Sequence, residues 1–139
     1  MIDFVQPHGG LEKLEIEKHY DRNLSPLVLD QKKIKQVIMN LVMNARHAIG
    51  EAGTLTVATR LDAQTGHTCV SIKDTGYGIE KRDLPRIFDP FFTTKPTGEG
   101  TGLGLSVSYG IVKSHGGNIN VTSEPGRGSE FVVSLPATS

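Results

Sequence analysis

Hydrophobic positions along the chain recur with two different periods, which predicts a mixture of strands and helices. A period of two indicates strands over 11–21, 54–61, 67–74, 118–124 and 129–135. The turn sequence Ala-Gln-Thr-Gly separates the second strand from the third, and Pro-Gly-Arg-Gly separates the fourth from the fifth. Each of these two pairs is therefore expected to form a hairpin.

A helical period predicts a first long helix in the N-terminal half. It is expected to begin after Asp30, whose side chain suits an N-cap, and to end at Gly50. Between these residues, apolar side chains from Ile34 to Ile49 recur every three or four positions.

Leu103, Val107 and Ile111, spaced four residues apart, indicate a second long helix that ends at the glycine pair 116–117. A short helix is expected over 80–87, followed by an irregular stretch. The order strand, helix, two strands, two helices, two strands is typical of an α+β fold. We expect a two-layer α/β sandwich with a mixed, mostly antiparallel sheet and helices on one face.

Composition narrows the class of protein. A chain of 139 residues suits one domain with a real core. Its 15 basic and 15 acidic residues balance, which argues against a nucleic-acid-binding surface. The single cysteine excludes a disulfide framework, and no apolar run is long enough to span a bilayer. A soluble, cytoplasmic domain without membrane contact of its own is expected, whether or not a longer parent protein is membrane-anchored.

Glycines fill alternate positions from Gly98 to Gly104 and lead directly into the second helix. A P-loop requires Lys and then Ser or Thr after its last glycine, but Leu105 and Ser106 follow here. No third glycine completes a dinucleotide fingerprint either. Bare amides before a helix N-terminus form an anion-binding concavity, and the alternative is a mobile surface loop.

Two further segments carry candidate binding residues. Asp74 ends a predicted strand, and Gly76 and Gly78 permit a tight turn open to a flat ligand. The carboxylate is suited to accept from an exocyclic amine, and the alternative is an ordinary Asx turn. On the first helix, Asn40 and Asn44 share one face. Carboxamide oxygens suit Mg²⁺, which fills its other positions with water and phosphate.

His47 lies on the same helix face and is either a phosphate contact or a solvated surface histidine. The segment 88–102 is also unusual, because it holds Phe88, Phe91 and Phe92 before a polar remainder with Lys95. The phenylalanines are expected to dock on the domain or on a partner, and the remainder to act as a movable lid.

Five motifs follow one another along the chain: Asn-x-x-x-Asn at 40–44, Asp-x-Gly-x-Gly at 74–78, Phe-Asp-Pro-Phe-Phe at 88–92, Gly-x-Gly-x-Gly at 100–104 and Gly-x-Gly-Ser at 126–129. In this order they resemble the N, G1, F, G2 and G3 boxes of the ATP-binding catalytic domain of two-component sensor histidine kinases. That domain has the Bergerat fold of the GHKL superfamily. The resemblance covers about residues 14–136, and the sequences of the Phe-rich and glycine-rich motifs are most like those of the nitrogen-regulator and sensory-box subfamilies.

The resemblance implies ATP and Mg²⁺ as cofactors. It implies that Asn44 coordinates the ion and that Asn40 assists. It also implies that Asp74 accepts from the adenine amine and that Lys95 approaches the phosphates. The other residues that it places around the nucleotide are His47, Gly76, Gly78, Ile79, Phe88, Gly100, Thr101, Gly102, Leu103, Gly104, Leu105 and Ser129.

The implied reaction is transfer of the γ-phosphoryl group to a histidine of a dimerisation domain, with a response regulator as a later partner. No histidine here is followed by Glu or Asp, as the family's acceptor is, so the acceptor is expected outside this chain. Residues 1–10 are interpreted as the end of a dimerisation domain or a linker, and 11–139 as the catalytic domain. The alternatives are an anti-sigma-type serine kinase and a non-catalytic ATP-sensing module.

Overall fold

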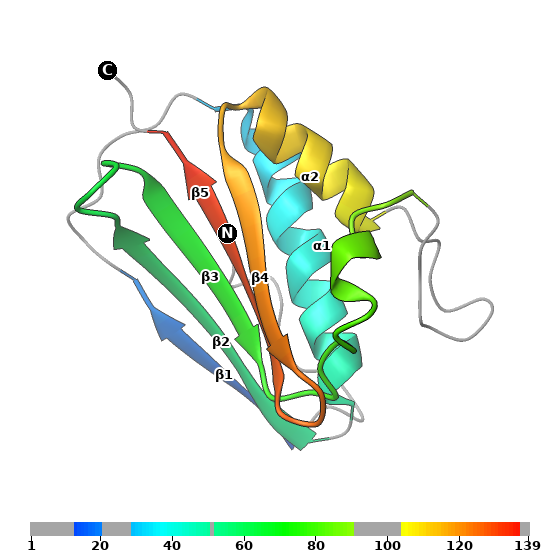
Figure 1. The fold of residues 1–139 in the computed structure, drawn as a ribbon. Helices are drawn as coiled ribbons and strands as arrows, with labels where there is room; N and C mark the ends of the chain where they lie inside the picture. The colour runs from blue at the N-terminus through cyan, green and yellow to red at the C-terminus, as the bar shows by residue number, and fades with distance from the viewer. Residues whose placement is uncertain (1–12, 21–28, 51, 91–103, 137–139) are drawn as a thin grey trace.

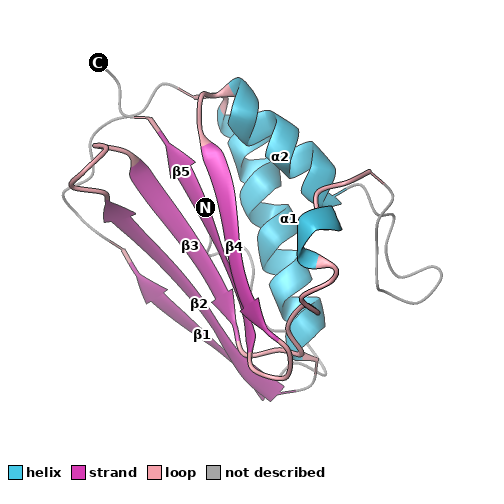
Figure 2. Ribbon diagram, viewed as in Figure 1, coloured by secondary structure: helices cyan, strands magenta, loops and turns pink. Residues whose placement is uncertain are grey.

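The computed structural model of the chain describes residues 13–20, 29–50, 52–90 and 104–136. Within them, a five-stranded sheet forms one layer, and two helices on one face of the sheet form the other (Figure 1; Figure 2). The predicted α+β class, a two-layer sandwich with its helices on one face, is confirmed. No described helix is long and apolar enough to cross a membrane. The predicted segment 1–10 lies outside the described residues.

The sheet is mixed, and its strands lie in the order β1-β2-β3-β5-β4. β1 runs parallel to β2, and the other neighbouring pairs are antiparallel, as expected. The five predicted strands are confirmed to within two residues at each end. Their bounds are β1 Lys13–His19, β2 Ala52–Leu61, β3 Thr68–Asp74, β4 Asn118–Glu124 and β5 Gly128–Leu135.

Helix α1, Gln31–Ile49, connects the parallel strands β1 and β2, which cannot be joined by a tight turn. Its predicted ends are confirmed. The Asp30 carboxylate accepts from the Lys33 N–H at 3.1 Å and so caps the first turn. Gly50 adopts a φ of 75°, and its N–H donates to the Arg46 carbonyl, which closes the last turn.

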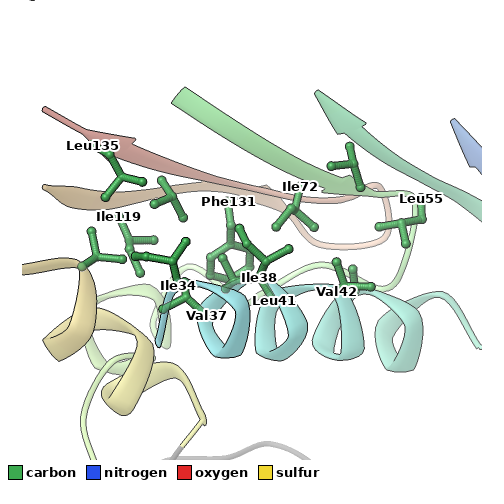
Figure 3. Close-up of a cluster of buried hydrophobic side chains, with 14 of the residues drawn as sticks. Ile34, Val37, Ile38, Leu41, Val42, Leu55, Ile72, Ile119, Phe131 and Leu135 are labelled. Carbon is green, nitrogen blue, oxygen red and sulfur yellow. The ribbon is translucent and has the colours of Figure 1, made fainter. Parts of the chain in front are cut away.

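The core lies between the inner face of the sheet and one face of α1 (Figure 3). Leu41 of α1 is fully buried, and Leu55 of β2 and Ile72 of β3 are buried with it. Burial of such a side chain stabilises the fold by about 1.5–3 kcal/mol. Because this face of α1 is fixed on the sheet, side chains on its other faces have defined positions relative to the strand ends.

The short helix expected over 80–87 is wrong in type and length. The structure has a three-residue 3-10 helix, Leu84–Arg86, preceded by turns. Pro85 explains the difference, because its ring would clash with the carbonyl four residues earlier in an α-helix and it has no N–H to donate. A 3-10 turn accepts proline at its start.

Helix α2, Gly104–Ser114, is present where predicted, but one residue of its predicted apolar stripe is exposed. Val107 is 40% exposed, so it does not belong to the apolar stripe assigned to it. The fully buried side chains of α2 are Ser108 and Val112. Ile111 is partly buried against the core as predicted, and Leu103 lies outside the described residues. Val107 is exposed because the small serine next to it occupies the contact with α1.

His115 joins the C-terminal end of α2 to the N-terminal end of α1. Its Nε2 accepts from the Asp30 N–H at 3.0 Å, and its Nδ1 lies 2.8 Å from the Ile111 carbonyl oxygen. The carbonyl can only accept, so the ring is in the neutral Nδ1–H form. His115 therefore has a structural role at a helix end.

Replacement of His115 by Ala is expected to lower the free energy of unfolding by about 1–2 kcal/mol, because two hydrogen bonds between helix ends are lost. Urea unfolding of both proteins measures the difference. His19→Ala is the matched control, because His19 is exposed at the end of the edge strand β1. Equal losses in the two variants would contradict the role given to His115.

Candidate functional site

Asn40 connects α1 to the start of α2. Its side chain is half-buried, and Nδ2 donates to the Gly104 carbonyl at 3.3 Å and to the Ser108 hydroxyl at 3.2 Å. Both contacts cross from one helix to the other. The amide nitrogen of Asn40 is therefore committed to α2, and its Oδ1 is the atom suited to a cation or a bound water.

Asn44 and His47 lie on the same side of α1 as Asn40, as their spacing predicted. Both side chains are half-buried. A hollow of about 410 Å³ lies beside His47, lined by Met43, Arg46, His47 and Gly50. This part of α1 thus offers an imidazole and a guanidinium at an open surface, and the Asn44 carboxamide lies one turn before His47 on the same helix.

A row of inward-facing side chains crosses the sheet where β3 ends. Strand pairing sets Leu55 opposite Asp74, and Asp74 opposite Ser129. It also sets Ser129 opposite Ser123. Directly opposed residues share a face, and Leu55 belongs to the core, so the polar part of this row lies on the helix-bearing face. Asp74 is 3% exposed and Ser129 7% exposed. Buried polar groups at the edge of a core are typical of a ligand site.

A backbone amide holds the Asp74 carboxylate. The Gly76 N–H donates to Oδ1 at 2.9 Å, and the nearby Ser129 backbone also lowers the pKa of Asp74. Burial nevertheless raises the pKa of Asp74 above the ordinary aspartate range, because desolvation outweighs the effect of these two backbone groups. A further donor supplied by a ligand would favour the charged form.

The loop after β3 packs tightly on two other parts of the chain. The Tyr77 N–H donates to the Ala48 carbonyl at 3.2 Å, near the end of α1, and the Tyr77 carbonyl accepts from the Gly126 N–H at 2.8 Å. A Cβ on Gly76 would overlap the Ala48 carbonyl, and one on Gly78 would overlap the backbone of the β4–β5 hairpin. Both glycines thus have a packing role in addition to the ligand role predicted for them.

Phe88 packs on the body of the domain, as predicted for this segment. Its ring centroid lies 5.1 Å from that of Tyr109 on α2 and 6.5 Å, edge-on, from that of Phe131 on β5. Lys113 places its Nζ 5.4 Å from the Tyr109 ring centroid. This cluster ties the segment after the 3-10 helix to α2, beside which it runs in Figure 1.

The other predicted contacts divide into two sets. Ile79 and Leu105 are partly buried against the core, so each has only part of its surface free for a ligand. The remaining predicted residues lie outside the described parts of the chain, namely Phe91, Phe92, Lys95, Gly100, Thr101, Gly102 and Leu103.

Helix α1 thus connects two groups of predicted residues. Asn40 meets Gly104 at one point, and Ala48 meets the loop after β3 eight residues later, about 12 Å along a helix that rises 1.5 Å per residue. The group at the loop after β3 can accept a hydrogen bond from an amine through Asp74. The group around Asn40 can offer neutral oxygen ligands to a cation. Sequence reasoning missed Ser123, although the alternation along β4 places this polar residue on the face of Ile119.

Comparison with known proteins agrees with this arrangement. Residues 29–139 match the family model described as histidine kinase-, DNA gyrase B- and HSP90-like ATPase. The sensor kinase CckA of Brucella abortus (strain 2308) is 41% identical over an alignment 136 residues long, which covers 88% of this chain and 14% of CckA. The chain therefore spans about a seventh of that relative.

Solved structures show the same likeness. The nucleotide-free catalytic domain of histidine kinase ThkA matches with a TM-score of 0.78 and 34% identity, over 91% of this chain and 82% of that one. Full-length ShkA in complex with AMPPNP matches with a TM-score of 0.78 and 30% identity, over 91% of this chain and 26% of ShkA. The chain belongs to the histidine kinase-, DNA gyrase B- and HSP90-like ATPase family, as a catalytic domain of the sensor histidine kinase type.

Proposed function

We propose that this domain binds ATP with the adenine amine donating to Asp74. The carboxylate is buried at the end of β3, and the Gly76 backbone amide orients it. Its raised pKa means that it gains from one more donor. This buried, oriented acceptor is the observation that carries the proposal. Gly76, Gly78 and Ser129 border the same place, and the structure of ShkA with AMPPNP supports a nucleotide in a related fold.

The described residues fit a magnesium ion shared with the phosphates. Asn44 and Asn40 offer carboxamide oxygens, which are hard ligands. In the described ranges, no three His, Cys, Asp or Glu side chains gather to hold a metal by themselves, so phosphate oxygens would complete the coordination. A bound ion would supply charge neutralisation at the phosphates. We assign the ion to Asn44, assisted by Asn40, and the phosphates to His47, Lys95 and the glycines from Gly100 to Gly104.

The proposed reaction is transfer of the γ-phosphoryl group to a histidine nitrogen of a dimerisation domain. A response regulator would later accept the phosphoryl group from that histidine. Asn40 is a carboxamide and cannot remove a proton from water, so this site disfavours hydrolysis and favours a docked acceptor. Residues 11–139 would be the catalytic domain, in the cytoplasm where ATP is supplied, and 1–10 the end of the dimerisation domain or a linker.

Incubation of the domain with γ-labelled ATP, Mg²⁺ and a separately purified dimerisation domain that bears a histidine tests this function. The expected product is a labelled acceptor whose phosphoryl bond is labile to acid and stable to base. An acid-stable label on serine would instead favour the anti-sigma-type kinase. Tight ATP binding without transfer to any acceptor would favour the ATP-sensing module. The CckA and ThkA comparisons favour the histidine acceptor over both.

Asn44→Ala is expected to weaken ATP binding by about tenfold in the presence of Mg²⁺, because a direct oxygen ligand of the ion is removed. Isothermal titration calorimetry with and without Mg²⁺ measures this effect. Binding without Mg²⁺ should change little, and Gln36→Ala, an exposed amide on the same helix, is the matched control. An unchanged affinity in Mg²⁺ would refute the metal role of Asn44.

A further inference from the structure

Ser123 lies at the centre of a hydroxyl network beside Asp74. Its Oγ accepts from the Ile79 N–H at 2.7 Å and lies 3.0 Å from the Gly128 carbonyl oxygen. It also lies 2.8 Å from the Ser129 Oγ. Strands β4 and β5 and the loop after β3 therefore meet at one side-chain oxygen.

The hydrogens in this network can be assigned by counting. A serine hydroxyl has one hydrogen and two acceptor positions. The Gly128 carbonyl can only accept, so it takes the hydrogen of Ser123. The Ile79 N–H can only donate, so it fills one acceptor position of Ser123. The remaining position accepts, which means that Ser129 donates its own hydrogen to Ser123.

This assignment leaves Ser129 with acceptor positions only. Ser129 lies opposite Asp74 on the same face of the sheet, and the Asp74 carboxylate is also an acceptor. Two adjacent acceptors attract an exocyclic amine directly or through a water, and they repel a carbonyl oxygen. Whether the site beside Asp74 offers a donor or only acceptors therefore depends on the direction of the Ser129 hydroxyl hydrogen.

We propose that Ser123 is a positioning residue that turns the Ser129 hydroxyl into an acceptor, so that the site selects purine nucleotides with a 6-amino group over those with a 6-oxo group. The proposal rests on the proposed binding of ATP at Asp74 and adds the residue that enforces the choice of base. Ser123 acts through Ser129 and through the Ile79 amide, and contact with the nucleotide is not required.

Removal of the Ser123 hydroxyl would release the Ser129 hydrogen. In Ser123→Ala, that hydrogen is free to donate to a 6-oxo group, which the intact network rejects. ATP would lose little at this position, because Asp74 still accepts from its amine. The preference for ATP over ITP should therefore fall by about tenfold, as expected when one hydrogen-bond mismatch is removed.

The experiment measures dissociation constants of ATP and ITP, with Mg²⁺, for four full-chain proteins: wild type, Ser123→Ala, Ser123→Ala with Ser129→Ala, and Ser134→Ala. The ratio of the two constants should fall about tenfold in Ser123→Ala and return toward the wild-type value in the double variant, which lacks the released hydroxyl. Ser134 is the matched control, because its hydroxyl lies 3.6 Å from the Cys69 Sγ on the other face of β5 and should leave the ratio unchanged.

Different failures have different meanings. Equal weakening of both nucleotides in Ser123→Ala would show a purely structural role and overturn the inference while leaving the proposed function intact. A wild-type chain that binds no ATP would overturn the proposed function, and the inference with it. If Ser123→Ala does not fold, Ser123→Cys keeps the side-chain size with a weak acceptor, and the same fall in the ratio is required of it.

Discussion

Asp74→Asn is expected to weaken ATP binding by about 100-fold at neutral pH, equivalent to about 2.8 kcal/mol. The carboxylate accepts from the Gly76 backbone amide and still has acceptor positions for the nucleotide amine. An asparagine at this position has one acceptor oxygen, and its NH₂ group must face either a backbone N–H or the adenine amine. A donor is then opposed to a donor in a buried place, where water cannot compensate.

Calorimetric titration with ATP and Mg²⁺ measures this loss, and Asp62→Asn is the matched control. Asp62 makes the same local turn as Asp74, since its Oδ1 accepts from the Gln64 N–H at 2.9 Å. The two environments differ, because the Gln64 amide lowers the pKa of Asp62, whereas burial raises that of Asp74. Asp62→Asn should leave ATP affinity unchanged. Equal affinities of the two variants would show that Asp74 only shapes a turn.

The raised pKa of Asp74 also sets the sign of a pH effect on the ligand-free domain. A carboxyl group with a raised pKa in the folded state binds its proton more tightly there than in the unfolded chain. Its contribution to stability is complete below the unfolded pKa and is lost as pH rises through the folded pKa. The wild type should therefore gain stability relative to Asp74→Asn as pH falls from 7 toward 4. If the difference in stability between the wild type and Asp74→Asn did not change with pH, the Asp74 carboxylate would not be desolvated in the folded domain.

Much of the fold could be predicted because local and global signals agree. In α1, the Asp30 cap, the Gly50 stop and the apolar stripe all indicate the same helix, and the structure has it. In the strands, period-two alternation coincides with burial, and Leu55 and Ile72 are buried where the pattern places them. Strand order could not be read from these signals, because the pairing of β3 with β5 joins segments far apart in the chain.

The errors arose where one residue decides between alternatives that a pattern leaves open. Pro85 limits the segment after β3 to a 3-10 turn, although its composition suits a helix. Ser108 takes the buried place on α2 because it receives the Asn40 amide, so the more apolar Val107 is left exposed. Periodicity counts apolar residues and does not register that a small polar residue fits a close contact between helices.

The candidate site was predictable in part for the same reason. Asp74 and Asn44 could be proposed from motif order, because binding chemistry restricts the residue type at those positions. Ser123 could not, since its importance depends on strand pairing that brings it to Ser129. The packing role of the loop glycines also required the structure, because motifs do not show which backbone approaches them.

Gly78→Ala is expected to lower the free energy of unfolding by about 3 kcal/mol or more, and Gly126→Ala by about 1–2 kcal/mol. The two glycines have nearly equal backbone angles, with φ of 76° and 79°, so the strain from a positive φ is the same in both variants. They differ in surroundings. A Cβ on Gly126 has nothing within 4 Å, whereas one on Gly78 would overlap the Glu124 carbonyl and lie 3.0 Å from the Pro125 Cα.

The difference in the free energy of unfolding between these two variants separates the cost of close approach from the cost of backbone strain. Urea unfolding measures it, provided that the dependence of the free energy on urea concentration is the same in both variants. The loop can relieve the overlap at Gly78 only by moving away from the β4–β5 hairpin, which would draw the Ile79 N–H from Ser123 and disturb the network beside Asp74. Gly78→Ala should therefore also bind ATP more weakly than Gly126→Ala under conditions where both are folded. Equal stability and equal affinity of the two variants would mean that glycine is required at position 78 only because of its positive φ. The contact between the loop and the hairpin would then not be what positions the adenine site.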